Sequence, residues 1–288
     1  MAFYRIESST SLLFQRLSKA FNYVSHDFWD IEGDKRVSQY PFFTTGPWVT
    51  MALIGLYLLF VKHFGPQWMR DRKPFDLKPL MVVYNVTMVI VSAYLFIVGC
   101  WRLNFGLDTW GCRPVNQEDT SSETSRFLLV AWLFFFSKLV EFADTIFFVL
   151  RKKNSQISNL HVIHHSIVPI SVWIGFKFAP GGNNAFFPLM NSGIHTLMYS
   201  YYGLTVMATE LGIGKQLSRW KKYLTAMQMG QFVLAIIHGL TSLAINDCPF
   251  PKSSLFINLG NAILFLVLFY SFYRKSYMNK ISQIKKCT

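Results

Sequence analysis

Residues 160–168 read Leu-His-Val-Ile-His-His-Ser-Ile-Val, with three histidines inside an otherwise apolar run. Because neighbours on a helix face are three or four residues apart, His161, His164 and His165 share one face. The surrounding stretch, residues 160–178, is apolar and long enough to cross a membrane as a helix. Ionisable side chains at that depth are costly, usually point into the protein and commonly mark a functional site. The stretch predicts a membrane-embedded helical bundle with a histidine site, which can bind metal, transfer protons or attack an acyl carbon.

The composition of the whole chain agrees with a membrane protein. Its 288 residues are 52% hydrophobic and 15% charged, whereas a soluble domain is about 25% charged. Since irregular backbone cannot face lipid, we predict an all-α, polytopic membrane protein with seven transmembrane helices. Each apolar segment can cross a hydrocarbon core of about 30 Å at about 1.5 Å per residue. The predicted spans lie near residues 42–61, 79–101, 127–150, 160–178, 185–208, 223–245 and 254–273.

Basic residues are placed as the topology of such a bundle requires. The net charge is +13, and most Lys and Arg residues fall in every second connection and in the C-terminal tail. By the positive-inside rule that side is cytosolic, so the C-terminus is cytosolic and seven spans leave the N-terminus luminal. This placement accounts for the charge, so we predict no nucleic-acid partner. The basic residues on this side include Arg70, Arg72, Lys73, Lys78, Arg151, Lys152, Lys153, Lys215, Arg219, Lys221, Lys222, Arg274 and Lys275.

Three parts of the chain differ in composition. Residues 1–41 form a luminal N-terminal segment, residues 42–273 the seven-helix domain, and residues 274–288 a basic cytosolic tail. In the first segment, apolar residues from Leu13 to Phe21 recur at helical spacing, which fits either an interfacial helix or a packed soluble cap. No cleavable signal peptide is expected, because this segment lacks an uninterrupted apolar core.

The C-terminal tail ends in Lys285-Lys286-Cys287-Thr288. Its two lysines stand third and fourth from a terminus predicted to be cytosolic, and they resemble the dilysine signal that returns membrane proteins to the endoplasmic reticulum. A lysine-rich solvated tail is the alternative. We predict a multi-pass protein of the endoplasmic reticulum membrane, retained through Lys285 and Lys286.

Two cysteines fall on the predicted luminal side. Cys112 lies in the connection before the third span and Cys248 in the short connection before the seventh. Disulfides persist in that compartment. We therefore predict a Cys112–Cys248 disulfide, with two unrelated thiols as the alternative.

The third span carries charges where lipid is expected. Lys138, Glu141 and Asp144 follow one another at intervals of three, so one helix face holds a cation and two anions. A neutralised polar seam that locks helices together would also explain them. The topology puts Glu141 and Asp144 in the cytosolic half of the bundle, at the depth of the histidines of residues 160–168.

The fifth and sixth spans add polar groups at a similar depth. His195, Tyr199 and Tyr202 lie on one face of the fifth span. Gln228 and Gln231 are three residues apart in the sixth, where hydrogen bonding between helices is a sufficient explanation. The more specific interpretation is that these two glutamines line a polar cavity. We predict a polar chamber that opens to the cytosol beneath basic loops, suited to a substrate with an anionic head and an apolar tail.

Two alternatives to acyl chemistry follow from this composition. Histidine clusters in membrane helices hold di-iron sites in lipid desaturases and hydroxylases, but those sites need more clustered histidines than the seven in this chain. A seven-helix receptor or transporter shares the topology. It does not explain a chamber that combines histidine, acid and lysine at one depth.

Four motifs occur in the order found in a known family. Residues 138–145 match KxxExxDT and residues 161–165 match HxxHH. Residues 195–202 match HxxMYxYY and residues 225–231 match TxxQxxQ. With these motifs the chain resembles the very-long-chain fatty acid elongases, the condensing enzymes of the ELO family.

The resemblance implies a 3-oxoacyl-CoA synthase. Such an enzyme condenses a long-chain acyl-CoA with malonyl-CoA, releases CO2 and CoA, and performs the first step of fatty acid elongation. It implies an acyl-histidine intermediate, with no metal and no cofactor besides the two CoA substrates. It also implies contact with endoplasmic reticulum lipid, with other enzymes of the elongation cycle and with further copies of the chain.

The resemblance also assigns roles to the residues of these motifs. His164 is the expected nucleophile, while His161, His165 and His195 orient groups or stabilise the enolate. Glu141 and Asp144 would fix histidine tautomers. The expected substrate-binding residues are Lys138, Tyr199, Tyr202, Gln228 and Gln231, with Lys221, Lys222 and Arg274 for the CoA phosphates.

Overall fold

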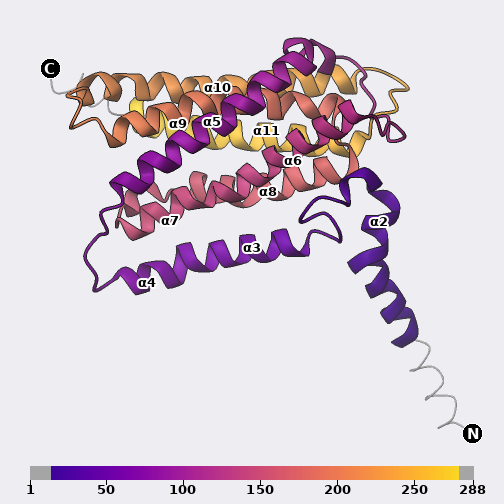
Figure 1. Cartoon of the computed structure of the whole chain (residues 1–288), viewed down its shortest axis with the longest axis horizontal. Coiled ribbons are helices and arrows are strands. Elements are labelled where there is room, and N and C mark those ends of the chain that lie inside the picture. The colour runs from indigo at the N-terminus through magenta and orange to yellow at the C-terminus, as the bar shows by residue number, and fades with distance from the viewer. Residues whose placement is uncertain (1–13, 279–288) are drawn as a thin grey trace, which may run out of the picture.

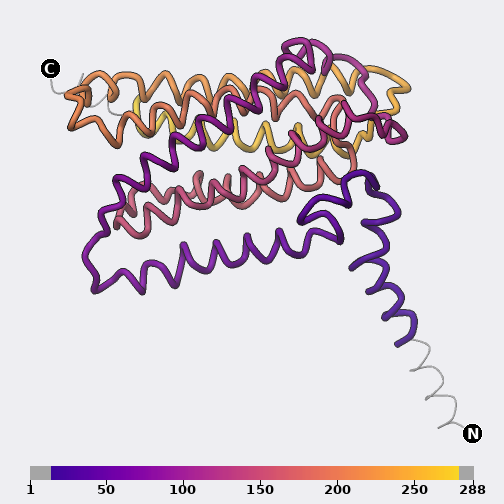
Figure 2. Tube along the Cα trace, in the orientation of Figure 1, coloured from indigo at the N-terminus to yellow at the C-terminus, as the bar shows by residue number. Residues whose placement is uncertain are grey.

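The computed structural model describes residues 14–278, and every regular element in that part of the chain is a helix. The predicted all-α class is therefore confirmed. Figure 1 and Figure 2 show long helices that run back and forth along one common direction. In chain order they are α3 (Trp48–Leu59), η3 (Phe60–Phe64), α4 (Gly65–Met69), α5 (Lys78–Arg102), α6 (Ser122–Val140), α7 (Phe142–Leu150), α8 (Asn159–Phe178), α9 (Phe186–Val206), α10 (Gly214–Leu243), α11 (Lys252–Tyr273) and η7 (Arg274–Met278).

Four helices in the described residues are long and apolar enough to cross a membrane, and they support the membrane-protein prediction. These four are Trp48–Met69, Lys78–Arg102, Gly214–Leu243 and Lys252–Met278. The helices α6, α8 and α9 are richer in polar side chains, because they carry most residues of the predicted site. Seven spans and their orientation therefore remain predictions.

The beginning of the first span differs from the prediction. We predicted a helix from Phe42, but α3 begins at Trp48. Phe42 has a φ of +73°, which is incompatible with a right-handed helix, and Pro47 occupies the N-cap of α3. At its other end the helix continues through η3 and α4 to Met69, beyond the predicted end.

Successive helices alternate in direction, so the connections gather at two ends of the bundle (Figure 1). Residues 70–77, 151–158 and 207–213 lie at the end where η7 also ends. The first two of these connections carry basic residues, and the third leads directly into the basic first turns of α10. Residues 103–121, 179–185 and 244–251 lie at the opposite end with the segment before α3. The alternation required by the positive-inside rule is thus present.

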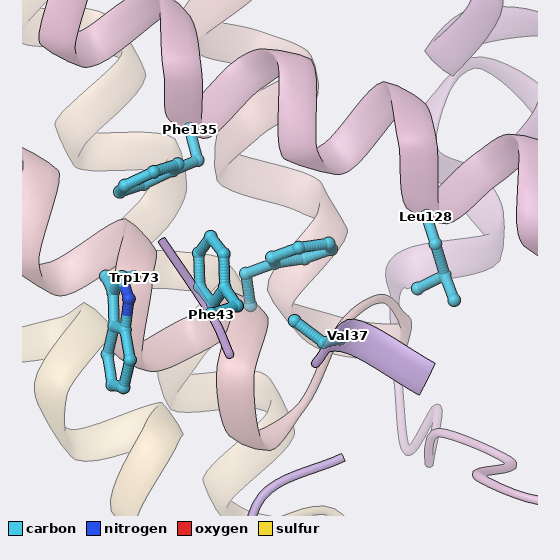
Figure 3. Packing of buried hydrophobic residues seen from close by; sticks show 6 residues of the cluster. Val37, Phe43, Leu128, Phe135 and Trp173 are labelled. Atoms are coloured by element: carbon cyan, nitrogen blue, oxygen red, sulfur yellow. The ribbon is translucent and has the colours of Figure 1, made fainter. Parts of the chain in front are cut away.

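The segment before α3 is packed into the second end of the bundle. Val37 and Phe43 are fully buried among Leu128 and Phe135 of α6 and Trp173 of α8 (Figure 3). The rings of Phe43 and Trp173 stack with centroids 5.3 Å apart. These contacts fix how the chain enters α3.

Two cations hold the same segment by hydrogen bonds. Lys177, fully buried near the end of α8, donates to Ser38 Oγ at 2.9 Å and to the Phe43 carbonyl at 3.2 Å. Arg36 pairs with Asp34 at 2.6 Å and donates to the Asp119 carbonyl at 2.7 Å in the connection before α6. Buried cations are tolerated because each has such partners.

The predicted disulfide is present. Cys112 and Cys248 are joined with an S–S distance of 2.02 Å, across 136 residues of sequence. The bond ties the connection before α6 to the connection before α11, at the end opposite the basic connections.

Removing this bond should lower thermal stability. A crosslink over so long a loop restricts the unfolded chain, and its loss typically costs about 2–5 kcal/mol. We expect Cys112→Ser to unfold at a clearly lower temperature than the unmodified protein in the same detergent, and a reductant to lower the unmodified protein's midpoint similarly. Cys100→Ser, which removes a thiol that is free in the structure, is the control. Equal midpoints for Cys112→Ser and the unmodified protein would contradict the stabilising role.

Candidate active site

A break between α6 and α7, within the third predicted span, lies at the centre of the site. The sequence predicted one continuous span here, but α6 ends at Val140 and α7 begins at Phe142, with Glu141 between them. Glu141 is 2% exposed. The backbone of Glu141 stays close to helical, so α7 continues in nearly the same direction as α6 (Figure 1).

A buried network joins α6 to α9 around this break. Lys138 Nζ donates to Glu141 Oε1 at 2.7 Å and to Asn191 Oδ1 at 2.9 Å. The same Glu141 oxygen lies 3.0 Å from His195 Nδ1. Gln231 of α10 extends the network, because its Oε1 accepts from Asn191 Nδ2 at 3.4 Å. Each buried charge therefore has a charged or polar partner, as burial requires.

The network also fixes the tautomer of His195. Its Nδ1 lies 3.0 Å from the Glu141 carboxylate and 3.4 Å from Lys138 Nζ. An ionised carboxylate only accepts hydrogen bonds, so the shorter contact places a proton on Nδ1. In neutral His195 the Nε2 atom then carries a free lone pair, available as an acceptor or base.

Asp144 and Thr145 of α7 hold two further groups. The Tyr199 hydroxyl donates to Asp144 Oδ2 at 2.8 Å, and Tyr199 is fully buried. Thr145 Oγ1 lies 2.8 Å from His161 Nε2 and 3.0 Å from the Tyr57 hydroxyl. A chain of hydrogen bonds thus runs from α3 through α7 to α8 and fixes the His161 ring.

The three histidines of α8 have different surroundings. Ser158 caps the helix by accepting from the His161 backbone N–H at 3.2 Å, which positions the first turn. The rings of His161 and His165 are 4.3 Å apart, and those of His164 and His165 are 5.3 Å apart. His165 is buried, whereas His164 is only half-buried and its ring makes no hydrogen bond within residues 14–278. On its other side His164 packs against Phe265 of α11 at 5.1 Å.

An apolar cavity begins beyond Phe265, the residue on which His164 packs. The cavity has a volume of about 140 Å³ and lies among α5, α6, α8, α9, α10 and α11. Phe265 lines it at the histidine end, and Phe186 and His238 line it toward the disulfide end. His238 stacks on Phe186 with centroids 4.2 Å apart and lies 2.8 Å from the Thr109 carbonyl. The polar site therefore adjoins a space suited to a hydrocarbon chain.

Other predicted residues lie outside the hydrogen-bonded network. Gln228 Nε2 contacts Met198 Sδ at 3.3 Å, and Tyr202 is 37% exposed, with its ring 6.1 Å from that of Tyr199. The predicted phosphate ligands lie near the basic connections instead. Of these, Lys221 and Lys222 are exposed in the first turns of α10, and Arg274 follows α11. Lys285 and Lys286 lie outside the described residues.

Three residues of the site were not predicted from the sequence. Asn191 precedes His195 by four residues and so shares its face, a spacing that would have revealed it. Tyr57 shares its face of the apolar helix α3 with Thr50, seven residues earlier, and this pair gave too weak a signal to reveal it. The Tyr84 hydroxyl is buried without a hydrogen-bond partner in residues 14–278, and its ring lies 5.9 Å from that of Tyr199.

The described residues contain no group of three or more His, Cys, Asp or Glu side chains placed to hold a metal ion. In α8 the close contacts of the histidines are with one another's rings, with Thr145 and with the rings of Phe148 and Phe265. His161 and His164 are both half-buried, and only His161 of the two has a side-chain hydrogen bond within residues 14–278.

Comparison with known proteins agrees with the motifs. Residues 42–285 match the family model described as ELO, the GNS1/SUR4 family. The chain is 41% identical over 257 residues to very long chain fatty acid elongase 7 of Drosophila melanogaster. The matched residues cover 88% of this chain and 76% of that protein. It is 38% identical over 278 residues to very long chain fatty acid elongase 4 of Mus musculus, covering 94% of this chain and 86% of that protein. The chain therefore belongs to the ELO (GNS1/SUR4) family, as its four motifs predicted.

Proposed function

We propose that this protein is a very-long-chain 3-oxoacyl-CoA synthase, which condenses a long-chain fatty acyl-CoA with malonyl-CoA in the first step of fatty acid elongation. The observation that carries the proposal is the half-buried imidazole of His164, which has no hydrogen-bond partner among residues 14–278 and packs on Phe265, a residue that lines the apolar cavity. The relatives described above are named fatty acid elongases, which agrees with this chemistry.

The first half-reaction transfers the acyl group to the enzyme. A lone pair on the His164 ring attacks the thioester carbonyl, and the C–S bond breaks as the tetrahedral intermediate collapses. The departing CoA thiolate takes up the proton that the imidazole releases, leaving a neutral acyl-imidazole. The acyl tail occupies the apolar cavity beyond Phe265.

The second half-reaction forms the new carbon–carbon bond. Malonyl-CoA loses CO2, and the electron pair of the broken bond forms the enolate of acetyl-CoA. Its α-carbon attacks the acyl carbonyl, the C–N bond to His164 breaks, and the imidazole regains its proton from water. The products are CO2, CoA and a 3-oxoacyl-CoA two carbons longer than the substrate.

The surroundings of the three histidines of α8 support His164 as the nucleophile. His161 Nε2 is engaged by Thr145, and His165 is 7% exposed beneath its neighbours. His164 is half-buried, and its ring is free of hydrogen bonds to the described residues. A nucleophile needs an unengaged lone pair that the substrate can reach.

The surrounding side chains would orient the reacting groups and stabilise the thioester and enolate oxygens. Glu141 holds the His195 ring with Nε2 free, and Lys138 balances the Glu141 charge. Asp144 holds Tyr199. We assign hydrogen bonding to the thioester and enolate oxygens to Tyr199, Tyr202, Gln228 and Gln231, and binding of the CoA phosphates to Lys221, Lys222 and Arg274.

We further propose that all seven predicted spans cross the endoplasmic reticulum membrane, with the N-terminus luminal and the C-terminus cytosolic. Two features support this orientation. Basic residues gather at one end of the bundle, in two of its connections and in the first turns of α10, as the positive-inside rule requires of the cytosolic end. The Cys112–Cys248 disulfide lies at the other end, where a lumen would keep it oxidised.

An assay of CO2 release tests the proposal. Purified protein would be incubated with carboxyl-labelled malonyl-CoA and a panel of long-chain acyl-CoAs, with air or without oxygen, and with or without a chelator. We expect labelled CO2 only when an acyl-CoA is present, a 3-oxoacyl-CoA product, and no effect of oxygen or chelator. Product formation that requires oxygen and iron would support the desaturase or hydroxylase alternative instead. No acyl-dependent CO2 release would contradict the proposal.

The Tyr84 hydroxyl, which has no hydrogen-bond partner in the described part of the chain, yields a separate prediction. A buried hydroxyl without a partner destabilises the fold, so we expect it to bind a substrate oxygen. Tyr84→Phe should lower kcat/KM about tenfold, equivalent to about 1.4 kcal/mol, while thermal stability stays equal or rises. Tyr94→Phe, at an exposed position of the same helix, should change neither. Unchanged kcat/KM in Tyr84→Phe would exclude the contact.

A further inference from the structure

The helix before α3 carries an exposed apolar stripe. Residues 14–22 are helical, and the helix continues through η1 (Tyr23–Asp27) and α2 (Phe28–Glu32). Phe14, Leu17, Phe21 and Val24 recur at intervals of three and four, so they share one face. Their side chains are 74%, 60%, 72% and 56% exposed. No described part of the protein covers this stripe.

The opposite face of this helix is polar. Gln15, Arg16, Lys19 and Asn22 lie on that face, and Ser18 lies at its edge. An apolar face of large side chains opposite a polar face with cations is the pattern of helices that lie in a membrane surface.

The direction of the helix is fixed by contacts at its base. Trp48 Nε1 of α3 donates to the Ser25 carbonyl at 2.7 Å. Phe28 packs on Phe178 of α8 with ring centroids 5.9 Å apart, and Trp29 packs on Trp173 at 5.4 Å. From this base the helix leaves the bundle crosswise to α3 (Figure 1). Since α3 belongs to a helix that can cross a membrane, a crosswise helix at its end runs along the membrane surface.

The exposed stripe adjoins the surface of α3 that faces lipid. Trp48, Val49 and Met51, in the first turn of α3, are 42%, 50% and 49% exposed. In a spanning helix such side chains contact lipid, and Trp is favoured at the level of the headgroups. The helix base at Ser25 is hydrogen-bonded to this same Trp48, so the stripe begins at the headgroup level.

We propose that residues 14–32 form an interfacial helix that lies on the bilayer at the end of the bundle where α3 begins. Phe14, Leu17, Phe21 and Val24 insert between the headgroups and the first acyl carbons, and Lys19 faces water and phosphate. The partner of this surface is the lipid bilayer. The inference rests on the membrane character of the chain and is independent of the proposed reaction.

Paired fluorescent labels in the full-length protein test this inference. Leu17→Cys and Lys19→Cys would be made separately in a Cys100→Ser/Cys287→Ser background that keeps the disulfide, labelled with an environment-sensitive fluorophore, and reconstituted into phosphatidylcholine nanodiscs. Size-exclusion elution as a single species would confirm that each labelled protein is folded. Quenching would be measured with phosphatidylcholine that carries a nitroxide near the headgroup, and with aqueous iodide.

We expect the label at position 17 to emit at shorter wavelength and to be quenched several-fold more strongly by the lipid nitroxide than the label at position 19. Iodide should show the reverse order. Equal quenching of the two labels, or a label at position 17 quenched by iodide alone, would overturn the proposal. Protection of position 17 from both quenchers, with crosslinking between Leu17→Cys chains, would overturn it in favour of a second copy as the partner.

Discussion

Replacement of His164 by alanine should lower kcat for condensation about 10³-fold or more, because it removes the atom to which the acyl group is transferred. Losses of this size follow when a covalent nucleophile is deleted and the rest of the site remains. The side chain is half-buried and makes no hydrogen bond to the described residues, so stability should change little. Activity and the thermal unfolding midpoint would be measured on the same preparation.

A matched control is available outside the bundle. His26 is an exposed histidine in η1, and His26→Ala should retain full activity. If His164→Ala keeps activity within tenfold of the unmodified protein, another group carries the acyl chain. His165→Ala should reduce activity less than His164→Ala does, because His165 is buried beneath the other two rings.

Replacement of Glu141 by glutamine should destabilise the folded protein by about 3–5 kcal/mol, because it leaves the Lys138 ammonium buried without an anion. Both side chains are at most 3% exposed, so water cannot replace the lost partner. The same change frees the His195 ring, so activity should fall as well. The expected readout is a much lower thermal midpoint and a low yield of monodisperse protein in detergent.

A double-mutant cycle separates this pair from a general effect of charge removal. Lys138→Met should be destabilising alone, and the double variant Lys138→Met/Glu141→Gln should be more stable than the sum of the single changes predicts. Glu210→Gln breaks an exposed salt bridge with Lys78 at 3.1 Å and should leave the midpoint unchanged. Additive effects at positions 138 and 141 would show that the two side chains do not stabilise each other.

The long helices could be predicted because each apolar run is about as long as a membrane-spanning helix. The start of α3 could not, since it depends on a tertiary contact. Phe42 is held at positive φ while its carbonyl accepts from Trp173 Nε1 at 2.8 Å, and that partner is 131 residues away. The break at Glu141 was also invisible, because the residues on either side of it favour a helix as strongly as the rest of α6 and α7.

Helical spacing was more informative about the site than about the boundaries. It placed Lys138 beside Glu141, and the structure confirms that contact at 2.7 Å. It could not show that Glu141 also contacts His195, because the register between two helices is set by packing and not by spacing within either one. Tyr57 was missed for the same reason, since its hydrogen bond to Thr145 joins residues 88 positions apart.

Mass spectrometry of the unmodified protein after incubation with a long-chain acyl-CoA alone tests the central claim most directly. The account predicts a single acyl adduct per chain, located in the peptide that contains residues 161–165, which disappears when malonyl-CoA is added and yields the 3-oxoacyl-CoA. An adduct on a cysteine, or condensation by a protein that never forms the histidine adduct, would contradict it.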